Sequence, residues 1–127
     1  MTYRLDHIAL LVRDLDASVA FLTGVLGLEE SPNPMGGATI RWIEIGDGRR
    51  FHLQAGDLAT THVEKHTHFA LATADFDASL ARFRAQGVAF SDMRGTPGAI
   101  NTRPDGMRAV FIQDPNGYWF EINDSRA

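Results

Sequence analysis

The sequence predicts an α+β protein whose two halves share one order of elements, β-α-β-β-β. The first observation is an internal repeat: residues 7–20 and 68–81 are identical at eight of fourteen positions. Such a repeat indicates two copies of one supersecondary unit, and we expect the copies to be related by a pseudo-two-fold axis. The second observation is the length of 127 residues, which suits one domain or two half-domains that share a core.

A weaker correspondence joins the far ends of the halves. Gly48 aligns with Gly117, each in a turn, and this alignment pairs His52 with Glu121. The offset between the halves is 61 residues in the first match and 69 in the second. About eight additional residues therefore lie in the second half, where residues 94–106 read as a long loop.

The elements of the first half follow from periodicity and turn signals. In order, we expect a strand over 4–12, a helix from Asp14 to Gly27, a short strand at 28–31, a loop at 31–37, and strands over 38–45 and 50–55. Aspartate and serine at the helix start can cap free N–H groups, and leucine and valine recur inside it at helical spacing. The Gly46-Asp-Gly sequence is a hairpin turn signal.

The second half repeats this order. The expected elements are a strand over 66–73, a helix over 76–86 ended by Gly87, a strand over 88–93, the loop 94–106, and strands over 107–113 and 118–123. Residues 57–65 have no clear period and read as a linker. The chain is thus predicted to be a single domain of module one (about 1–56), a linker (about 57–65) and module two (about 66–127).

Composition narrows the class of protein. The net charge is −4, from 12 basic and 16 acidic residues, and no basic run is present, which argues against nucleic acid as a partner. The chain has no cysteine, so disulfides and thiolate metal sites are excluded. No stretch reaches the roughly 18 apolar residues of a membrane span, and the first residues lack the apolar region of a signal peptide. We expect a cytoplasmic protein without a membrane partner.

Four polar side chains are predicted to share the inner faces of the sheets. Side chains alternate along a strand, and apolar rows such as Phe120 and Ile122 take the helix side. The groups left on the opposite face are His7, His52, His68 and Glu121. Three imidazoles and one carboxylate in an interior need a common partner. A single divalent ion supplies it, and these ligand types suit Zn, Ni, Fe(II) or Mn.

Other residues are candidates for contact with a substrate or for proton transfer. Glu121 is the first candidate base and His66 the second, because a base must reach the proton that it moves. Arginines can orient an anionic substrate, and aromatic or methionine side chains can line the cleft. The predicted substrate-binding residues are Arg41, Arg103, Arg108, Trp42, Trp119 and Met107.

Three segments carry a resemblance to a known superfamily. They are Asp6-His-Ile-Ala-Leu with Val12-Arg-Asp-Leu-Asp-Ala-Ser, His68-Phe-Ala-Leu, and Phe111-Ile-Gln-Asp-Pro-Asn-Gly-Tyr-Trp-Phe-Glu. Over essentially its whole length the chain resembles the vicinal oxygen chelate superfamily, which includes glyoxalase I, extradiol dioxygenases and bleomycin resistance proteins. The resemblance implies two βαβββ modules around an open, barrel-like cleft, metal ligands at His7, His68 and Glu121, and a homodimer.

One departure from the resemblance bears on function. Common bacterial glyoxalase I carries a glutamate where this chain has His52, and that glutamate helps to move the substrate proton. With Glu121 as the only anionic ligand, a divalent site would carry a net charge of about +1 and act as a stronger Lewis acid.

Three functions stay open. The first is a metal-dependent isomerase, lyase or epimerase that chelates two adjacent substrate oxygens and stabilises an enolate or oxyanion. The second is an extradiol-type dioxygenase that uses His7, His68 and Glu121 as a 2-His-1-carboxylate triad. The third is a protein that binds a drug or metabolite without chemistry, as bleomycin resistance proteins do.

Overall fold

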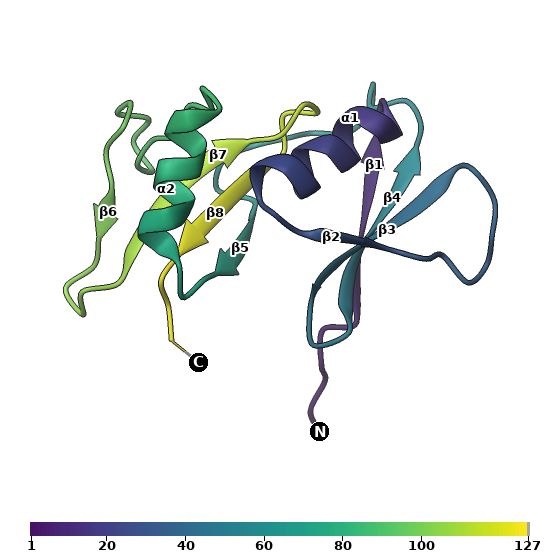
Figure 1. The fold of residues 1–127 in the computed structure, drawn as a ribbon, viewed down its shortest axis with the longest axis horizontal. Helices are drawn as coiled ribbons and strands as arrows, with labels where there is room; N and C mark the ends of the chain where they lie inside the picture. The colour runs from purple at the N-terminus through teal and green to yellow at the C-terminus, as the bar shows by residue number, and fades with distance from the viewer. Residues whose placement is uncertain (127) are drawn as a thin grey trace. The chain divides into compact units, whose positions relative to one another are not determined.

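The computed structural model describes residues 1–126 and divides the chain into two compact units. The first spans Met1–Thr61 and the second begins at His62 (Figure 1). None of the helices in the described residues is long and apolar enough to cross a membrane. Each unit is described below by itself.

The first unit is a four-stranded sheet with one helix. Its elements are β1 (His7–Val12), α1 (Leu15–Ala20), a π-helical turn (Phe21–Val25), β2 (Glu29–Ser31), β3 (Ile40–Gly46) and β4 (Arg49–Ala55). The strand order is β1-β4-β3-β2, with β1 parallel to β4 and the other pairs antiparallel. Asp14 caps α1 by accepting a hydrogen bond from the Ala17 N–H, as the sequence predicts.

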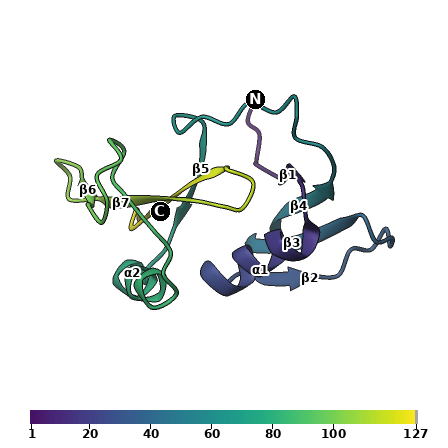
Figure 2. The ribbon, with the colours of Figure 1, turned by 90° about the horizontal axis from the view of Figure 1, so that it is seen from above.

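The second unit has the same topology. Its elements are β5 (His68–Ala72), α2 (Phe76–Ala85), β6 (Asn101–Thr102), β7 (Arg108–Gln113) and β8 (Trp119–Asn123). The strand order β5-β8-β7-β6 again has one parallel pair, β5 with β8, and antiparallel pairs elsewhere. In Figure 2, α2 is seen along its axis on one side of these strands. The α+β class and the two βαβββ modules are therefore confirmed.

One predicted strand is wrong. Residues 88–93 form no strand, and only Ser91 makes isolated bridges, to Phe111 and Pro97. The backbone groups nearby are used locally instead: the Phe90 carbonyl accepts from the Gly98 N–H at 2.8 Å. The fourth strand of this sheet is β6, which lies inside the segment 94–106 that the sequence predicts as a loop.

The alternation of strand side chains agrees with the prediction. Phe51, Leu53 and Phe120 are 0% exposed and Ile122 is 4% exposed, on the helix side of their sheets. Their strand neighbours His52 and Glu121 are only half-buried and point to the opposite face. The apolar rows thus fix which face each candidate site residue occupies.

Candidate metal site

The second unit brings His68 and Glu121 together on the inner face of its sheet. In the β5–β8 pairing, Glu121 lies opposite Ala70. Ala70 follows His68 by two residues and therefore lies on the same face of β5. His68 Nε2 lies 3.7 Å from Glu121 Oε1, with side chains 24% and 17% exposed. Two ligand atoms on one ion, each bonded at about 2.1 Å, are separated by about 3.0–3.4 Å. The pair therefore fits a shared divalent ion with a shift of a few tenths of an ångström.

Both partners of this pair are held from behind. The Nδ1–H of His68 donates to the Lys65 carbonyl at 2.8 Å, since a carbonyl can only accept. In the neutral ring the lone pair is then on Nε2, the atom that faces Glu121. The amide of Asn123 donates to Glu121 Oε2 at 2.6 Å, which leaves Oε1 for His68. Outer partners of this kind orient metal ligands, and an acceptor for the N–H of a histidine also raises the basicity of its ring.

We expect Asn123→Ala to weaken metal binding about 10-fold, because Glu121 would lose the donor that fixes its orientation. Asn123 is 6% exposed, so thermal unfolding should be followed beside metal titration. Asn33→Ala, which removes an amide from a loop of the first unit, is the control and should leave the affinity unchanged. Equal affinity in the Asn123 variant and the wild type would contradict this role.

The first unit places His7 and His52 in a stack of three rings. The Trp42 and His52 rings are 4.2 Å apart between centroids and inclined by 2°. The His52 and His7 rings are 4.1 Å apart and inclined by 12°. Trp42 lies opposite His52 in the β3–β4 pairing, so the stack crosses the inner face of the sheet. Arg50 extends it, with its guanidinium carbon 5.4 Å from the Trp42 centroid.

The charges around this stack differ for the two histidines. His7 Nδ1 is 2.8 Å from the Asp6 carboxylate, so Nδ1 carries a proton, and Nε2 is the nitrogen that a metal ion could bind. The hydrogen bond with His7 lowers the pKa of Asp6. Burial, followed by the proximity of His7 and Arg50, lowers the pKa of His52. His52 is therefore a neutral ring at pH 7.

The predicted substrate-binding arginines are occupied by carboxylates. Arg41 donates to Glu30 with Nε and Nη2, at 2.7 and 2.8 Å, and to Asp16 with Nη1. Arg108 is held in the same manner by Asp124 and Asp77. Both guanidinium groups therefore tie a strand to the first turn of a helix.

Two other predicted residues meet in one turn of the second unit. Arg103 donates to Asp105 at 2.6 Å and, more weakly, to the Met107 sulfur at 3.6 Å. His66, the second candidate base, lies in the turn before β5 and not on the strand, so the predicted start of that strand at residue 66 is wrong. Its exposed ring contacts Glu64 at 2.7 Å.

Replacing Arg41 tests whether this residue anchors β3 to Glu30 of β2 and to Asp16 of α1. The hydrogen bond from Arg41 lowers the pKa of Glu30 below its ordinary 4.5. A lowered carboxyl pKa stabilises the fold above the ordinary value and loses that contribution as the pH falls through the folded value. We expect Arg41→Met to cost less than about 1 kcal/mol at neutral pH and to flatten the fall in Tm between about pH 5 and pH 3. An unchanged acid limb would contradict the anchoring role.

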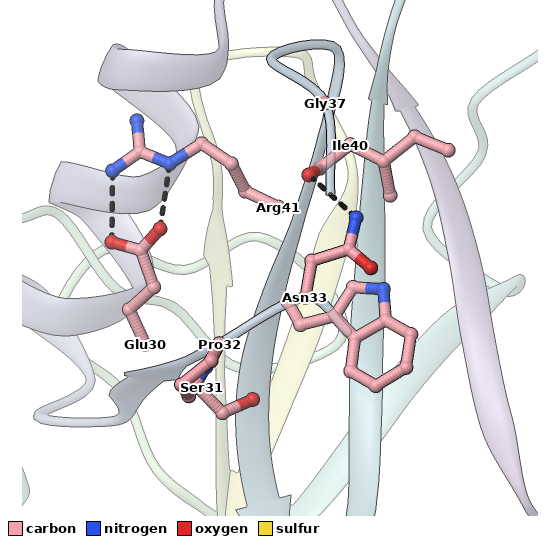
Figure 3. A pocket seen from close by; sticks show the side chains of 8 residues that line it. Glu30, Ser31, Pro32, Asn33, Gly37, Ile40 and Arg41 are labelled. Atoms are coloured by element: carbon pink, nitrogen blue, oxygen red, sulfur yellow. Dashed lines mark hydrogen bonds and ion pairs between the residues drawn. The ribbon is translucent and has the colours of Figure 1, made fainter. Parts of the chain in front are cut away.

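A cavity of about 420 Å³ lies beside β2 and the loop that follows it (Figure 3). Its lining residues are Glu30, Ser31, Pro32, Asn33, Gly37, Ile40, Arg41 and Trp42. Asn33 shapes the loop by donating to the Ile40 carbonyl at 3.2 Å. Because Trp42 also stacks on His52, the cavity shares a wall with the ring stack of the same unit.

Each unit supplies two of the four predicted metal ligands. Within the described part of either unit, no three histidine, aspartate or glutamate side chains are grouped as a metal ion requires. The joining of the two pairs around one ion, within one chain or across two, stays a prediction.

Three supporting residues were missed by the sequence analysis. Asp6 directly precedes His7, and Asn123 lies two residues after Glu121 and so on the same face of the strand. Both residues could have been found from the sequence, because each is close in the chain to a predicted ligand. Lys65 was assigned to the linker, although it is the only lysine in the chain.

The chain is similar in sequence and fold to known proteins. The chain is 32% identical to the solved structure of oxidase ChaP-H2, with a TM-score of 0.81 over 99% of this chain and 96% of the other. For oxidase ChaP-H1 the values are 29% and 0.79, over 98% of each chain. The uncharacterized protein YwbC of Bacillus subtilis (strain 168) is 29% identical, over 96% of this chain and 98% of the relative. A family model matches residues 4–122, and the chain belongs to the Glyoxalase/Bleomycin resistance protein/Dioxygenase superfamily.

Proposed function

We propose that the chain is a metal-dependent oxidoreductase that uses dioxygen on a small substrate with two adjacent oxygens. The proposed ligands are His7, His68 and Glu121, with His52 outside the ligand set. This ligand set is that of the second of the three functions open from the sequence, the extradiol-type dioxygenase. The observation that carries it is the stacking of His7 on His52.

The stack leaves room for only one histidine of the first unit on the ion. An imidazole binds a metal along the nitrogen lone pair, in the plane of its ring. The His7 and His52 rings are inclined by only 12° at a centroid distance of 4.1 Å, so their planes do not meet near the rings. In this arrangement both rings cannot direct a lone pair at one ion. His7 is the better ligand, because Asp6 holds its Nδ1–H as outer carboxylates commonly hold metal-binding histidines.

Three ligands of this type suit oxygen chemistry. A 2-His-1-carboxylate triad leaves coordination positions open and is typical of non-haem Fe(II) oxygenases. A bound Fe(II) would supply a site for adjacent substrate oxygens and for the electron transfer that dioxygen requires. The similarity to two proteins named oxidases, at 32% and 29% identity, supports the same reading.

The residues of the chain would orient the ion and shield it. His68 presents Nε2 because the Lys65 carbonyl holds its Nδ1–H. Glu121 presents Oε1 because Asn123 donates a hydrogen bond to Oε2. This hydrogen bond restrains the carboxylate from leaving the metal ion to act as a base. His52, held neutral at pH 7 between the rings of Trp42 and His7, would remain as a proton acceptor beside the substrate.

The alternative is the isomerase, lyase or epimerase chemistry of a four-ligand site. One observation supports it: the lowered pKa of His52 keeps its imidazole in the neutral form that binds metals. This alternative requires the His52 ring to leave the stack. A homodimer and a cytoplasmic location remain part of the proposal.

Metal content and oxygen uptake test the proposal together. Purified wild type, His7→Ala and His52→Ala would be compared by elemental analysis and by oxygen consumption with catechols and hydroquinones. His62→Ala, in the predicted linker, is the matched control. We expect near-stoichiometric metal in the wild type, in His52→Ala and in the control, and its loss in His7→Ala.

Other outcomes would overturn the proposal. Loss of metal in His52→Ala, equal to the loss in His7→Ala and without oxygen uptake in the wild type, would favour the four-ligand isomerase or lyase. A wild type that takes up no Fe, Zn, Ni or Mn would favour a protein that binds a drug or metabolite without chemistry.

A further inference from the structure

Lys65 differs from every other cation of the chain. The chain has 12 lysine and arginine residues, and Lys65 is the only lysine among them. It lies in the turn that precedes β5, three residues before His68, and its side chain is half-buried. The turn is closed by a hydrogen bond from the Thr67 N–H to the Glu64 carbonyl at 3.0 Å.

The ammonium group of Lys65 ties this turn to a distant segment. Nζ donates to the Asp92 carbonyl at 2.7 Å and to Ser91 Oγ at 3.1 Å. Ser91 is itself bonded to Phe111 of β7 through both backbone groups, at 3.1 and 2.8 Å. The ammonium group therefore anchors the turn to the sheet.

The same group lies over two aromatic rings of the sheet. Nζ is 4.7 Å from the centroid of the Trp119 ring and 5.3 Å from that of Phe111. A compact ammonium has three donors that can diverge toward two oxygens and the ring faces, whereas the planar fork of arginine favours flat, bidentate partners. This environment explains why a lysine suits a position in a chain that otherwise uses arginine.

The backbone and the side chain of Lys65 both contact the surroundings of the proposed ligand His68. Its carbonyl accepts the Nδ1–H of His68 at 2.8 Å, and the rings of His68 and Phe111 are nearly perpendicular, with centroids 5.2 Å apart. Trp119 lies opposite His68 in the β5–β8 pairing. One residue thus fixes the proton of the imidazole and contacts the two rings that surround it.

We propose that Lys65 is a positioning residue that keeps His68 in its Nδ1–H tautomer, with Nε2 directed at Glu121. The ammonium group fixes the turn, and the turn fixes the carbonyl that accepts the His68 proton. The inference rests on the proposed role of His68 as a ligand, but the state of its imidazole is measured without metal.

The test replaces Lys65 by methionine, which keeps the length and apolar stem but removes the charge and the donors. In metal-free protein, long-range ¹H–¹⁵N spectra of the histidine rings report which nitrogen of His68 carries the proton. We expect the wild type to show the Nδ1–H tautomer and Lys65→Met to show a mixture of the two. The Kd for Zn²⁺, measured against a competing chelator, should rise about 10-fold.

A matched control separates positioning from general loss of stability. Arg84→Met removes another cation that lies over a ring of the same unit, 5.4 Å from the centroid of Phe90. We expect it to change neither the His68 tautomer nor the Kd for Zn²⁺. Ser91→Ala, which removes one of the two oxygens bound by Nζ, should shift the tautomer part of the way if Lys65→Met does not fold.

The results separate this inference from the proposed function. An unchanged His68 tautomer in Lys65→Met, or in Ser91→Ala if that variant is needed, would overturn the role of Lys65. A changed tautomer with an unchanged Kd for Zn²⁺ would confirm that Lys65 positions His68, but it would count against His68 as a metal ligand.

Discussion

Glu121→Gln is expected to abolish stoichiometric metal binding. Glutamine keeps the shape of the side chain and an oxygen that Asn123 can bind, but it removes the only carboxylate of the proposed ligand set. Loss of a residue that merely supports a ligand costs about 10–100-fold in metal affinity, so loss of the ligand itself should cost more than about 100-fold. Elemental analysis and Zn²⁺ titration against a chelator would measure the change.

A second carboxylate supplies the control for this variant. Glu44 lies on β3 of the first unit and is 3.0 Å from Arg50, with its side chain 30% exposed. Glu44→Gln removes the same charge from a comparable strand position, and we expect full metal content. Stoichiometric metal in Glu121→Gln would remove Glu121 from the ligand set and the proposed function with it.

Phe120→Ala is expected to cost about 3–5 kcal/mol of unfolding free energy. Phe120 is 0% exposed, and its ring packs 5.4 Å from that of Phe69. Native domains are stable by about 5–15 kcal/mol, so this one truncation removes a large part of the total. Urea unfolding followed by circular dichroism would measure it.

The repeat supplies a companion variant and a control. Phe51 is the counterpart of Phe120 in the first unit and is also 0% exposed, so Phe51→Ala should cost a similar amount. Tyr3 is 90% exposed, and Tyr3→Ala should change the unfolding free energy by less than about 0.5 kcal/mol. A cost below about 1.5 kcal/mol for both buried phenylalanines would contradict the assigned cores.

Most of the fold was predictable because it depends on local period. The alternation of Phe51 with His52 and of Phe120 with Glu121 assigns both faces of β4 and β8 without any tertiary information. The hairpin after β3 was equally predictable, because Asp-Gly is a typical sequence of a two-residue turn with positive φ values. In the structure Asp47 and Gly48 have φ values of 54° and 73°.

The errors lie where long-range contacts decide the structure. Residues 88–93 have the composition of a strand, but the Phe90 and Asp92 carbonyls accept hydrogen bonds from Gly98 and Lys65 instead of from a neighbouring strand. The two residues of β6 are too few to produce a period. Lys65 and Ser91 are 26 residues apart in the sequence, and no local sequence pattern predicts their contact.

The stack of Trp42, His52 and His7 shows how the two halves of this chain differ at one equivalent place. His52 and Glu121 occupy the same place in copies with one topology, yet one now sits between two rings and the other beside an imidazole and an amide. The two copies therefore present different groups at one place: the first unit has a stacked aromatic ring there, and the second has a negative charge. Exchanging the two residues would therefore disrupt both arrangements at once.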